Sequence, residues 1–303
     1  MSDSVIPLLI DTDPGIDDAL ALLLAWGSRK ARVEVLTTVA GNTPLERGTL
    51  NVFRLLALRQ PTPFPRVAAG AAKPLSRPLT TAGRYHGEDG LGDLDDWPPV
   101  TVRPAPEPAA AAMVEAARRH GGRLRLVALG PLTNVALALE SDSRAMIGLG
   151  RLVAMGGAVD VPGNVTPTAE FNIHVDPEAA TRVLAAGFQL DLVPLDATRQ
   201  AVLERQALEA ALSGAPEPAA ARILAFTRRA FRIDGDAMYL HDPLAVAVAL
   251  DPTLVEWEAV RLEIGGDGAT RRVPGPPNCR AARRVDTERF LPLLLERLCP
   301  ASW

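Results

Sequence analysis

The stretch LLIDTDPGIDDA, residues 8–19, carries four carboxylates between two apolar segments: Asp11, Asp13, Asp17 and Asp18. The apolar segment before them, residues 5–10, is short and continuous, which is typical of a strand buried on both faces of a parallel sheet. The segment after them, residues 19–26, is apolar nearly all round and predicts a buried helix. A Pro-Gly pair favours a turn between the two. The aspartates are therefore expected at the carboxyl end of a strand, where open α/β sheets bind ligands.

These four acidic side chains would raise one another's pKa values unless a cation neutralised them. Oxygen ligands suit a hard divalent ion, Ca²⁺ or Mg²⁺. Helix capping is the alternative, because the helix dipole stabilises Asp17 or Asp18 at a helix N-terminus without a metal. Capping does not account for Asp11 and Asp13. An EF-hand is excluded, because its loop would need Glu where this chain has Leu22.

The length and composition indicate one large domain. The 303 residues fit a single α/β domain spanning residues 1–303, and alternating strand and helix patterns predict a doubly wound, mainly parallel sheet flanked by helices. A net charge of −4 gives no argument for nucleic acid or membrane partners. The two cysteines are too few for a disulfide framework, and the N-terminus lacks a signal-peptide pattern. A cytoplasmic location is therefore expected.

Other polar residues lie where predicted strands end or helices begin. Asn42 follows the apolar segment 33–40, and an ordinary turn residue is the alternative. His86 lies in a long glycine-rich loop of a length typical of functional or disordered loops, although a lone loop histidine is more often simply exposed. Asp242 opens an apolar helix and could act only as its cap, while the adjacent His241 could pack against the core.

A further candidate is the segment AEFN, residues 169–172. Glu170 and Asn172 are two positions apart, so an extended backbone would point both side chains the same way. Together with Asn164 they suit sugar hydroxyl groups, because each hydroxyl both donates and accepts hydrogen bonds. Ordinary loop structure is the alternative.

Several of these motifs resemble those of the inosine-uridine-preferring nucleoside hydrolases: DTDPGIDDA (11–19), HGEDGLG (86–92), GPLTN (130–134), AEFN (169–172) and HDPLA (241–245). The resemblance extends from Leu9 to about Leu298. It implies the nucleoside hydrolase fold and calcium-dependent hydrolysis of the N-glycosidic bond of ribonucleosides, giving ribose and a free base for purine and pyrimidine salvage. It also implies a homodimer or homotetramer.

The resemblance implies a role for each matching residue. The Ca²⁺ ligands would be Asp13, Asp18, the main-chain carbonyl of Leu129, and Asp242. Asp11 would not bind the ion itself but would orient the residues that do. Asp13 would also accept a proton from the attacking water, and His241 would protonate the leaving base. The substrate-binding residues would be Asp17, Asn42, His86, Met155, Asn164, Glu170, Phe171, Asn172 and Asp242.

The chain departs from the family pattern in the helix before HDPLA. Family members often carry tyrosines there, whereas this chain reads FTRRAFR at residues 226–232. The ribose half of the site is therefore expected to follow the family, while the base half is altered and the preferred base is not predicted.

Two other functions are weighed against the hydrolase. A phosphohydrolase that uses the aspartates of a D-x-D motif would need a lysine far along the chain, and no lysine follows Lys73. The second alternative is a non-catalytic nucleoside or ribose sensor that keeps the metal site, and the intact Asp13 and His241 argue against it. A turnover assay separates the sensor from the enzyme.

Overall fold

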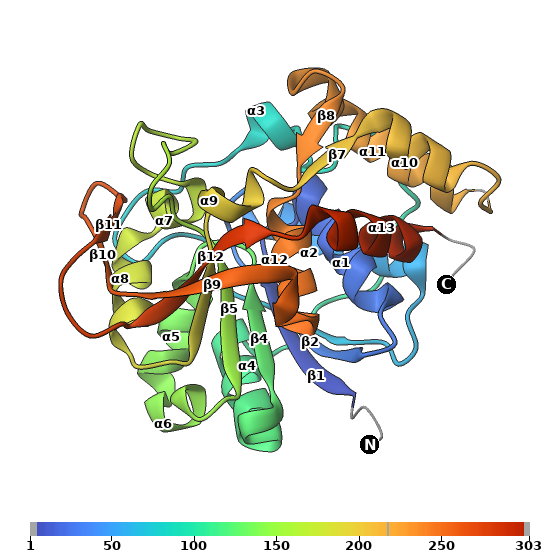
Figure 1. The fold of residues 1–303 in the computed structure, drawn as a ribbon. Helices are drawn as coiled ribbons and strands as arrows, with labels where there is room; N and C mark the ends of the chain where they lie inside the picture. Colours follow the sequence, from blue (N-terminus) through green and yellow to red (C-terminus); the bar gives the residue numbers. More distant parts are fainter. Residues whose placement is uncertain (1–4, 217, 300–303) are drawn as a thin grey trace.

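The centre of the molecule is an eight-stranded sheet in the order β3-β2-β1-β4-β5-β6-β12-β9 (Figure 1). The structure is a computed structural model, and it describes residues 5–216 and 218–299. The strands of this sheet are β1 (Ile6–Thr12), β2 (Ala31–Thr38), β3 (Arg66–Ala69), β4 (Arg125–Ala128), β5 (Arg151–Met155), β6 (Leu190–Val193), β9 (Val255–Val260) and β12 (Cys279–Val285). All neighbours pair in parallel except β9, which runs antiparallel to β12 at the edge. The predicted mainly parallel sheet is confirmed.

Helices cover both faces of this sheet. The hydrophobic core on one face is shared by α1 (Ile16–Gly27), α2 (Leu45–Arg59), α10 (Arg205–Leu212), α11 (Ala219–Ile233), α12 (His241–Leu250) and α13 (Thr287–Leu298). The other face packs against α4 (Ala109–His120), α5 (Thr133–Ser141), α6 (Ser143–Ile147) and α8 (Pro177–Ala185). The fold is therefore doubly wound, as the alternating pattern predicts.

Strand β1 explains why the apolar segment before the aspartates is uninterrupted. Leu8 and Ile10 belong to the core on the α1 face, whereas Leu9 belongs to the core on the α4 face. All three are completely buried. Complete burial of such a side chain contributes about 1.5–3 kcal/mol, so both faces of β1 stabilise the fold.

The remaining elements are short. They are the helices α3 (Gly83–His86), α7 (Phe171–Val175) and α9 (Leu195–Thr198), the 3₁₀ turns Gly121–Arg123 and Pro252–Leu254, and the strand pairs β7 (Val202–Glu204) with β8 (Ala237–Tyr239) and β10 (Leu262–Ile264) with β11 (Thr270–Arg272). In Figure 1 the parallel strands run upward from the N-terminus, and α3, α7 and β8 lie at their upper, carboxyl ends. These three short elements thus lie around the end of the sheet where the aspartates lie.

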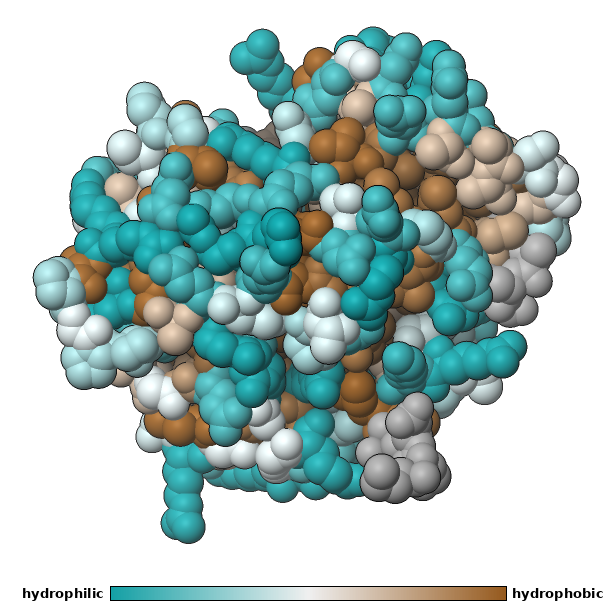
Figure 2. Space-filling model, in the orientation of Figure 1, coloured by the Kyte–Doolittle hydropathy of each residue, from teal (hydrophilic) through white to brown (hydrophobic). Residues whose placement is uncertain are grey.

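The surface carries few large hydrophobic side chains. The face in Figure 2 is mostly hydrophilic, with hydrophobic side chains visible between the α10–α11 pair and α13. Within residues 5–216 and 218–299, no helix is long and apolar enough to cross a membrane. Three exposed hydrophobic residues, Val165, Ile233 and Tyr239, line a cavity at the carboxyl ends of the strands.

Candidate active site

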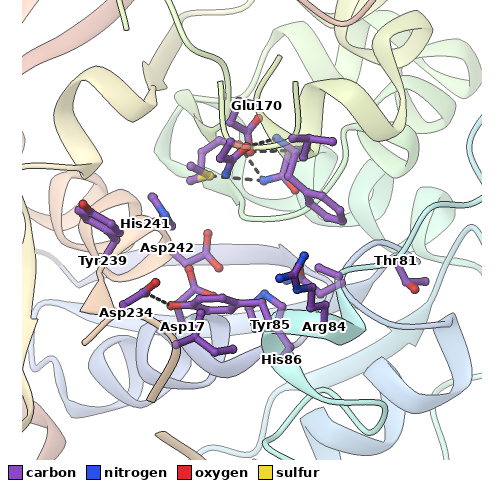
Figure 3. Close-up of a pocket in the computed structure, with 18 of the residues that line it drawn as sticks. Asp17, Thr81, Arg84, Tyr85, His86, Glu170, Asp234, Tyr239, His241 and Asp242 are labelled. Atoms are coloured by element: carbon purple, nitrogen blue, oxygen red, sulfur yellow. Dashed lines mark hydrogen bonds between the residues drawn. The ribbon is translucent and has the colours of Figure 1, made fainter. Parts of the chain in front are cut away.

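This cavity has a volume of about 760 Å³, and Figure 3 shows most of the residues that line it. These residues form two walls that differ in burial. We call the buried lining residues the inner wall: Asp17, Asn42, His86, Leu129, Met155, Glu170, Asn172 and Asp242. We call the partly or fully exposed lining residues the outer wall: Thr80, Thr81, Ala82, Arg84, Tyr85, Asn164, Val165, Phe171, Arg199, Arg229, Arg232, Ile233, Asp234, Tyr239 and His241. The structure brings every predicted substrate-binding residue to this one cavity.

Three acids meet at the base of the cavity. One carboxylate oxygen from each of Asp17, Asp18 and Asp242 lies within 4.8 Å of the other two. They come from the first turns of α1 and α12, so two helix N-termini converge here. Burial, followed by the charge of Asp18, raises the pKa of Asp17 to about 8. Burial also raises the pKa of Asp242, and Asp17 adds to the effect. Such a set fits a divalent cation, which removes the repulsion between the carboxylates.

Asp13 is not part of that set of three, but its carboxylate is fixed beside it. A Cβ atom at Gly41 would overlap Asp13 Oδ2, and one at Gly130 would lie 2.6 Å from Oδ1. The main-chain N–H of Asn42 donates to Oδ2 at 2.6 Å, while buried Oδ1 has no hydrogen-bond partner among the residues that the structure describes. Burial, followed by the charge of Asp18, raises the pKa of Asp13. An unpaired buried oxygen of this kind fits a cation or a donated proton.

Asp18 caps α1 and also belongs to the acid cluster. Its Oδ2 accepts the main-chain N–H of Gly15 at 2.9 Å and the side-chain amide of Asn42 at 3.0 Å. Its Oδ1 accepts the hydroxyl of Thr12 at 2.5 Å. The sequence left helix capping and metal ligation as alternative roles for Asp18. In the structure Asp18 caps α1 and still lies within the cluster of three acids.

Asp11 is held from the neighbouring elements β2 and α5. Its Oδ1 accepts the hydroxyl of Thr37 at 2.7 Å and the amide of Asn134 at 2.8 Å. Burial raises the pKa of Asp11 to about 7. These contacts fix the side chain of Asp11 to β2 and α5, while its main-chain carbonyl accepts the N–H of Leu129 at 2.8 Å.

The AEFN segment differs from its predicted conformation. Residues 171–175 form the helix α7, and Glu170 is its N-cap, so the expectation of an extended backbone is wrong. Glu170 accepts the main-chain N–H groups of Asn172 and Ile173, at 2.9 and 3.1 Å, and that of Gly157 at 2.9 Å. Figure 3 shows Glu170 across the cavity from the acid cluster. The N-cap formed by Glu170 favours a helix here rather than the predicted extended backbone. The side chains of Glu170 and Asn172 nevertheless both line the cavity.

The side-chain amide of Asn172 connects two strand ends on the inner wall. It donates to the carbonyl of Leu129 at 2.5 Å and to that of Met155 at 3.2 Å. The carbonyl of Leu129, the residue that follows β4, therefore points toward Asn172 in the lining of the cavity, and its role as a metal ligand stays a prediction. Across the loop, Asn164 Oδ1 accepts the N–H of Phe171 at 2.9 Å, which fixes Asn164 above α7.

Two neutral histidines complete the site. His86 Nδ1 accepts the main-chain N–H of Ile16 at 3.0 Å, so its proton lies on Nε2. His241 Nδ1 lies 2.7 Å from the hydroxyl of Thr198, and its ring stacks on Tyr239. Burial lowers the pKa of each histidine to about 4. Each ring is therefore uncharged at neutral pH. His86 carries its proton on Nε2, whereas the tautomer of His241 depends on whether its Nδ1 accepts from or donates to the hydroxyl of Thr198.

The outer wall contains residues that the sequence analysis did not assign. Tyr85 directly precedes His86, and Tyr239 lies two positions before His241. Their closeness in the sequence to the predicted histidines is the signal that could have identified them. The Tyr85 hydroxyl donates to Asp234 Oδ2 at 2.6 Å. Arg229 and Arg199 also line the cavity, and no local motif marked them.

Comparisons of the sequence and of the structure with known proteins indicate the same family. Residues 8–292 match the family of inosine-uridine preferring nucleoside hydrolases. The chain is 34% identical to the inosine-uridine preferring nucleoside hydrolase of Leishmania major, with 96% of each sequence covered. It is 37% identical to the pyrimidine-specific ribonucleoside hydrolase RihA of Shewanella sp. (strain MR-7), again with 96% of each covered. A plant nucleoside hydrolase, PpNRh1, superposes with a TM-score of 0.89 and 33% identity over 97% of this chain and 99% of the other.

The fold, the cavity and these matches define the class of enzyme. It is a ribonucleoside hydrolase, which breaks the N-glycosidic bond between ribose and a nucleobase. The chain belongs to the inosine-uridine preferring nucleoside hydrolase family. The resemblance seen in the motifs is thereby confirmed.

Proposed function

We propose that this enzyme hydrolyses ribonucleosides with the help of a bound Ca²⁺ ion. The observation that carries the proposal is the convergence of Asp17, Asp18 and Asp242 beside the unpaired oxygen of Asp13. Four acids at the base of the cavity suit a hard cation. The polar groups on the opposite side of the cavity suit the hydroxyl groups of a sugar.

The ligands of the ion would be Asp13, Asp18, the Leu129 carbonyl and Asp242, with Asp17 near enough to join them. When bound, the ion would supply Lewis acidity that makes a water molecule a better nucleophile. Asp11, held by β2 and α5, would keep the end of β1 in place for these ligands.

The protein side chains would do the rest of the chemistry. Asp13 would accept the proton of the attacking water at Oδ1, the oxygen that no protein donor occupies. Asp17, Asn164, Glu170 and Asn172 would hold the ribose hydroxyls. The transition state resembles an oxocarbenium ion, as in other glycoside hydrolysis, and the surrounding carboxylates stabilise its positive charge.

The leaving base would depart between the two histidines. His241 would donate a proton to it, and His86, with Met155 and Phe171, would contact it or the sugar. Because burial lowers the pKa of His241 to about 4, its imidazole has to take up a proton from solvent before it can act as the acid. The negative charge that develops on the base as the bond breaks favours that protonated form.

The decisive experiment measures free ribose released from a panel of purine and pyrimidine nucleosides, with and without a calcium chelator. Turnover that the chelator abolishes and added Ca²⁺ restores is expected, and the panel identifies the preferred base. Tight nucleoside binding without ribose release would instead identify a sensor. Chelator-resistant turnover would remove the ion from the proposal.

We also propose a role in purine and pyrimidine salvage for a cytoplasmic homodimer or homotetramer. The relatives are named for their action on different nucleosides, so the base preference of this chain needs its own measurement. Light scattering coupled to size-exclusion chromatography measures the oligomer; a monomeric mass would contradict that part.

A further inference from the structure

The altered helix before HDPLA, α11, contacts the turn that carries His86. Arg229 of α11 donates from Nε to the carbonyl of Tyr85 at 3.1 Å. Its Nη2 donates to the carbonyls of Arg84 and Gly83, at 3.0 and 3.4 Å. Its Nη1 forms an ion pair with Asp93 at 3.1 Å. Each nitrogen of the guanidinium therefore has an acceptor on the segment 83–93.

A second contact connects the end of α11 to the same turn. Asp234, the residue that follows α11, accepts the hydroxyl of Tyr85 at 2.6 Å. The ring of Tyr85 meets that of His86 edge to face, with 4.9 Å between ring centroids. His86 in turn accepts the N–H of Ile16 at the start of α1. Contacts thus run from α11 through α3 to the helix that carries Asp17 and Asp18.

The turn depends on such outside contacts for its shape. The helix α3 has only four residues, and a helix this short is not stable by itself. Its last carbonyls have no partners within the helix, and Arg229 supplies donors for them. The loop that follows packs closely on α11: a Cβ atom at Gly92, whose φ is +82°, would lie 2.9 Å from the carbonyl oxygen of Phe226. Contacts with α11 therefore help to fix the position of His86, together with the hydrogen bond from Ile16 and the contacts of the following loop with α2.

We propose that Arg229 is a positioning residue of this enzyme, which fixes the α3 turn and thereby places His86 and Tyr85 in the cavity. It acts through these two side chains, because its own nitrogens are already engaged by main-chain carbonyls and Asp93. An arginine is needed because its planar fork donates in several directions at once, whereas a lysine offers one nitrogen. This inference rests on the proposed function for its kinetic test only.

The chain offers a matched control on the same helix. Arg222 lies seven residues, about two turns, before Arg229, so it faces the same side of α11. It forms an ion pair with Asp96 at 2.5 Å and stacks over Trp97. Arg222 thus also connects α11 to the long loop, but it is not among the residues that line the cavity.

The kinetic test compares Arg229→Met, Arg229→Lys and Arg222→Met on the best nucleoside substrate. Arg229→Met is expected to lower kcat/KM about tenfold or more, because small displacements of site groups are costly. Arg229→Lys should fall between Arg229→Met and the unchanged enzyme, since it restores the ion pair but not the forked contacts. Arg222→Met should stay within about twofold of the unchanged enzyme. Equal losses in the two methionine variants would overturn the proposal, because a general loosening of α11 would then explain both.

A second readout does not depend on turnover. The chain has four histidines, so the imidazole NMR signals of His86 can be assigned by comparison with His86→Gln. These signals are expected to shift in Arg229→Met and to stay unchanged in Arg222→Met. Unshifted His86 signals in Arg229→Met would overturn the positioning role. Absence of turnover by the unchanged enzyme would count against the proposed function, while the NMR comparison would still decide the role of Arg229.

Discussion

The inner and outer walls of the cavity are built in different ways. The inner wall lies on the ends of sheet strands and on helix N-termini, where Asp17 and Asp242 are 6% and 3% exposed. The outer wall lies on loops, on short elements such as α3 and β8, and on the end of α11; its Ile233 and Tyr239 are 48% and 40% exposed. A rigid frame therefore holds the acids, whereas more adjustable segments face the leaving group, as expected for chemistry on a scaffold and selectivity on loops.

This difference predicts two kinds of variant. Changes to the inner wall, or to the acids behind it, should lower the rate for every nucleoside alike. Changes to the outer wall should alter the ratio of rates between nucleosides. Each prediction below tests one side of that division.

The largest effect is expected for Asp13→Asn. The amide oxygen can keep the hydrogen bond from Asn42, so the shape of the site should persist, but the group no longer accepts a proton at the second position. We expect kcat to fall about 10³-fold for all nucleosides. Asp11→Asn is the control, because Asp11 is bound by Thr37 and Asn134 and should lose much less. Near-normal kcat in Asp13→Asn would remove the proposed base.

Gly41→Ala tests whether the placement of Asp13 matters. The added Cβ would overlap Asp13 Oδ2, so the carboxylate has to move. We expect a loss of about 10²-fold in kcat/KM, similar for purine and pyrimidine nucleosides. Gly122→Ala is the matched control, since a Cβ there meets nothing within 4 Å. A fully active Gly41→Ala enzyme would show that the site tolerates a displaced Asp13.

His241 lies on the outer wall but is proposed to act in the reaction. His241→Ala should lower kcat on inosine about 10²-fold, because the base leaves without a proton donor. The loss should be much smaller on 4-nitrophenyl riboside, whose leaving group departs as an anion. Full activity of His241→Ala on inosine would rule out the acid role. An equal loss on both substrates would mean that His241 supports catalysis whatever the leaving group, as the inner-wall residues are expected to do, and does not act as the acid for the base.

The inner wall was largely predictable from the sequence because its signals are local. The aspartates follow an apolar strand and precede an apolar helix, and β1 and α1 form as that pattern predicts. Asp18 caps its own helix three residues from Gly15, so local structure and the site agree. The conformation of AEFN was predicted wrongly, because the Glu170 cap is a side-chain effect that alternation of residues does not reveal.

The outer wall was predictable only in part. Asn164, Phe171 and His241 were predicted, whereas the other outer-wall residues make contacts that join distant segments. Tyr85 and Asp234 are 149 positions apart, and Arg229 reaches carbonyls 144 to 146 positions earlier. Main-chain carbonyls carry no residue identity, so no sequence pattern marks them as the partners of an arginine. The sequence therefore showed that this half departs from the family, but not what replaces the tyrosines.

Thermal unfolding at two pH values tests the metal side of the inner wall. Burial raises the pKa of Asp11 to about 7 and that of Asp17 to about 8, above the unfolded value of 3.8. The metal-free fold is thus stabilised by protonation of these acids, and that stabilisation is lost as the pH rises from about 4 towards 8. Ca²⁺ binds the ionised form, so the rise in Tm on adding Ca²⁺ should be larger at about pH 8 than at about pH 5. A rise that is equal at both pH values would contradict this linkage.

The smallest effect is expected for Tyr85→Phe. The change removes the hydrogen bond to Asp234, but Asp234 is only half-buried, so water can replace the lost donor. We expect kcat on the best nucleoside to stay nearly constant while the ratio of kcat/KM between purine and pyrimidine nucleosides changes by less than about tenfold. Asp234→Asn is the control, since its amide oxygen still accepts from Tyr85. A uniform loss on every nucleoside in Tyr85→Phe would break the division between the two walls, because Tyr85 would then support the chemistry rather than the choice of base.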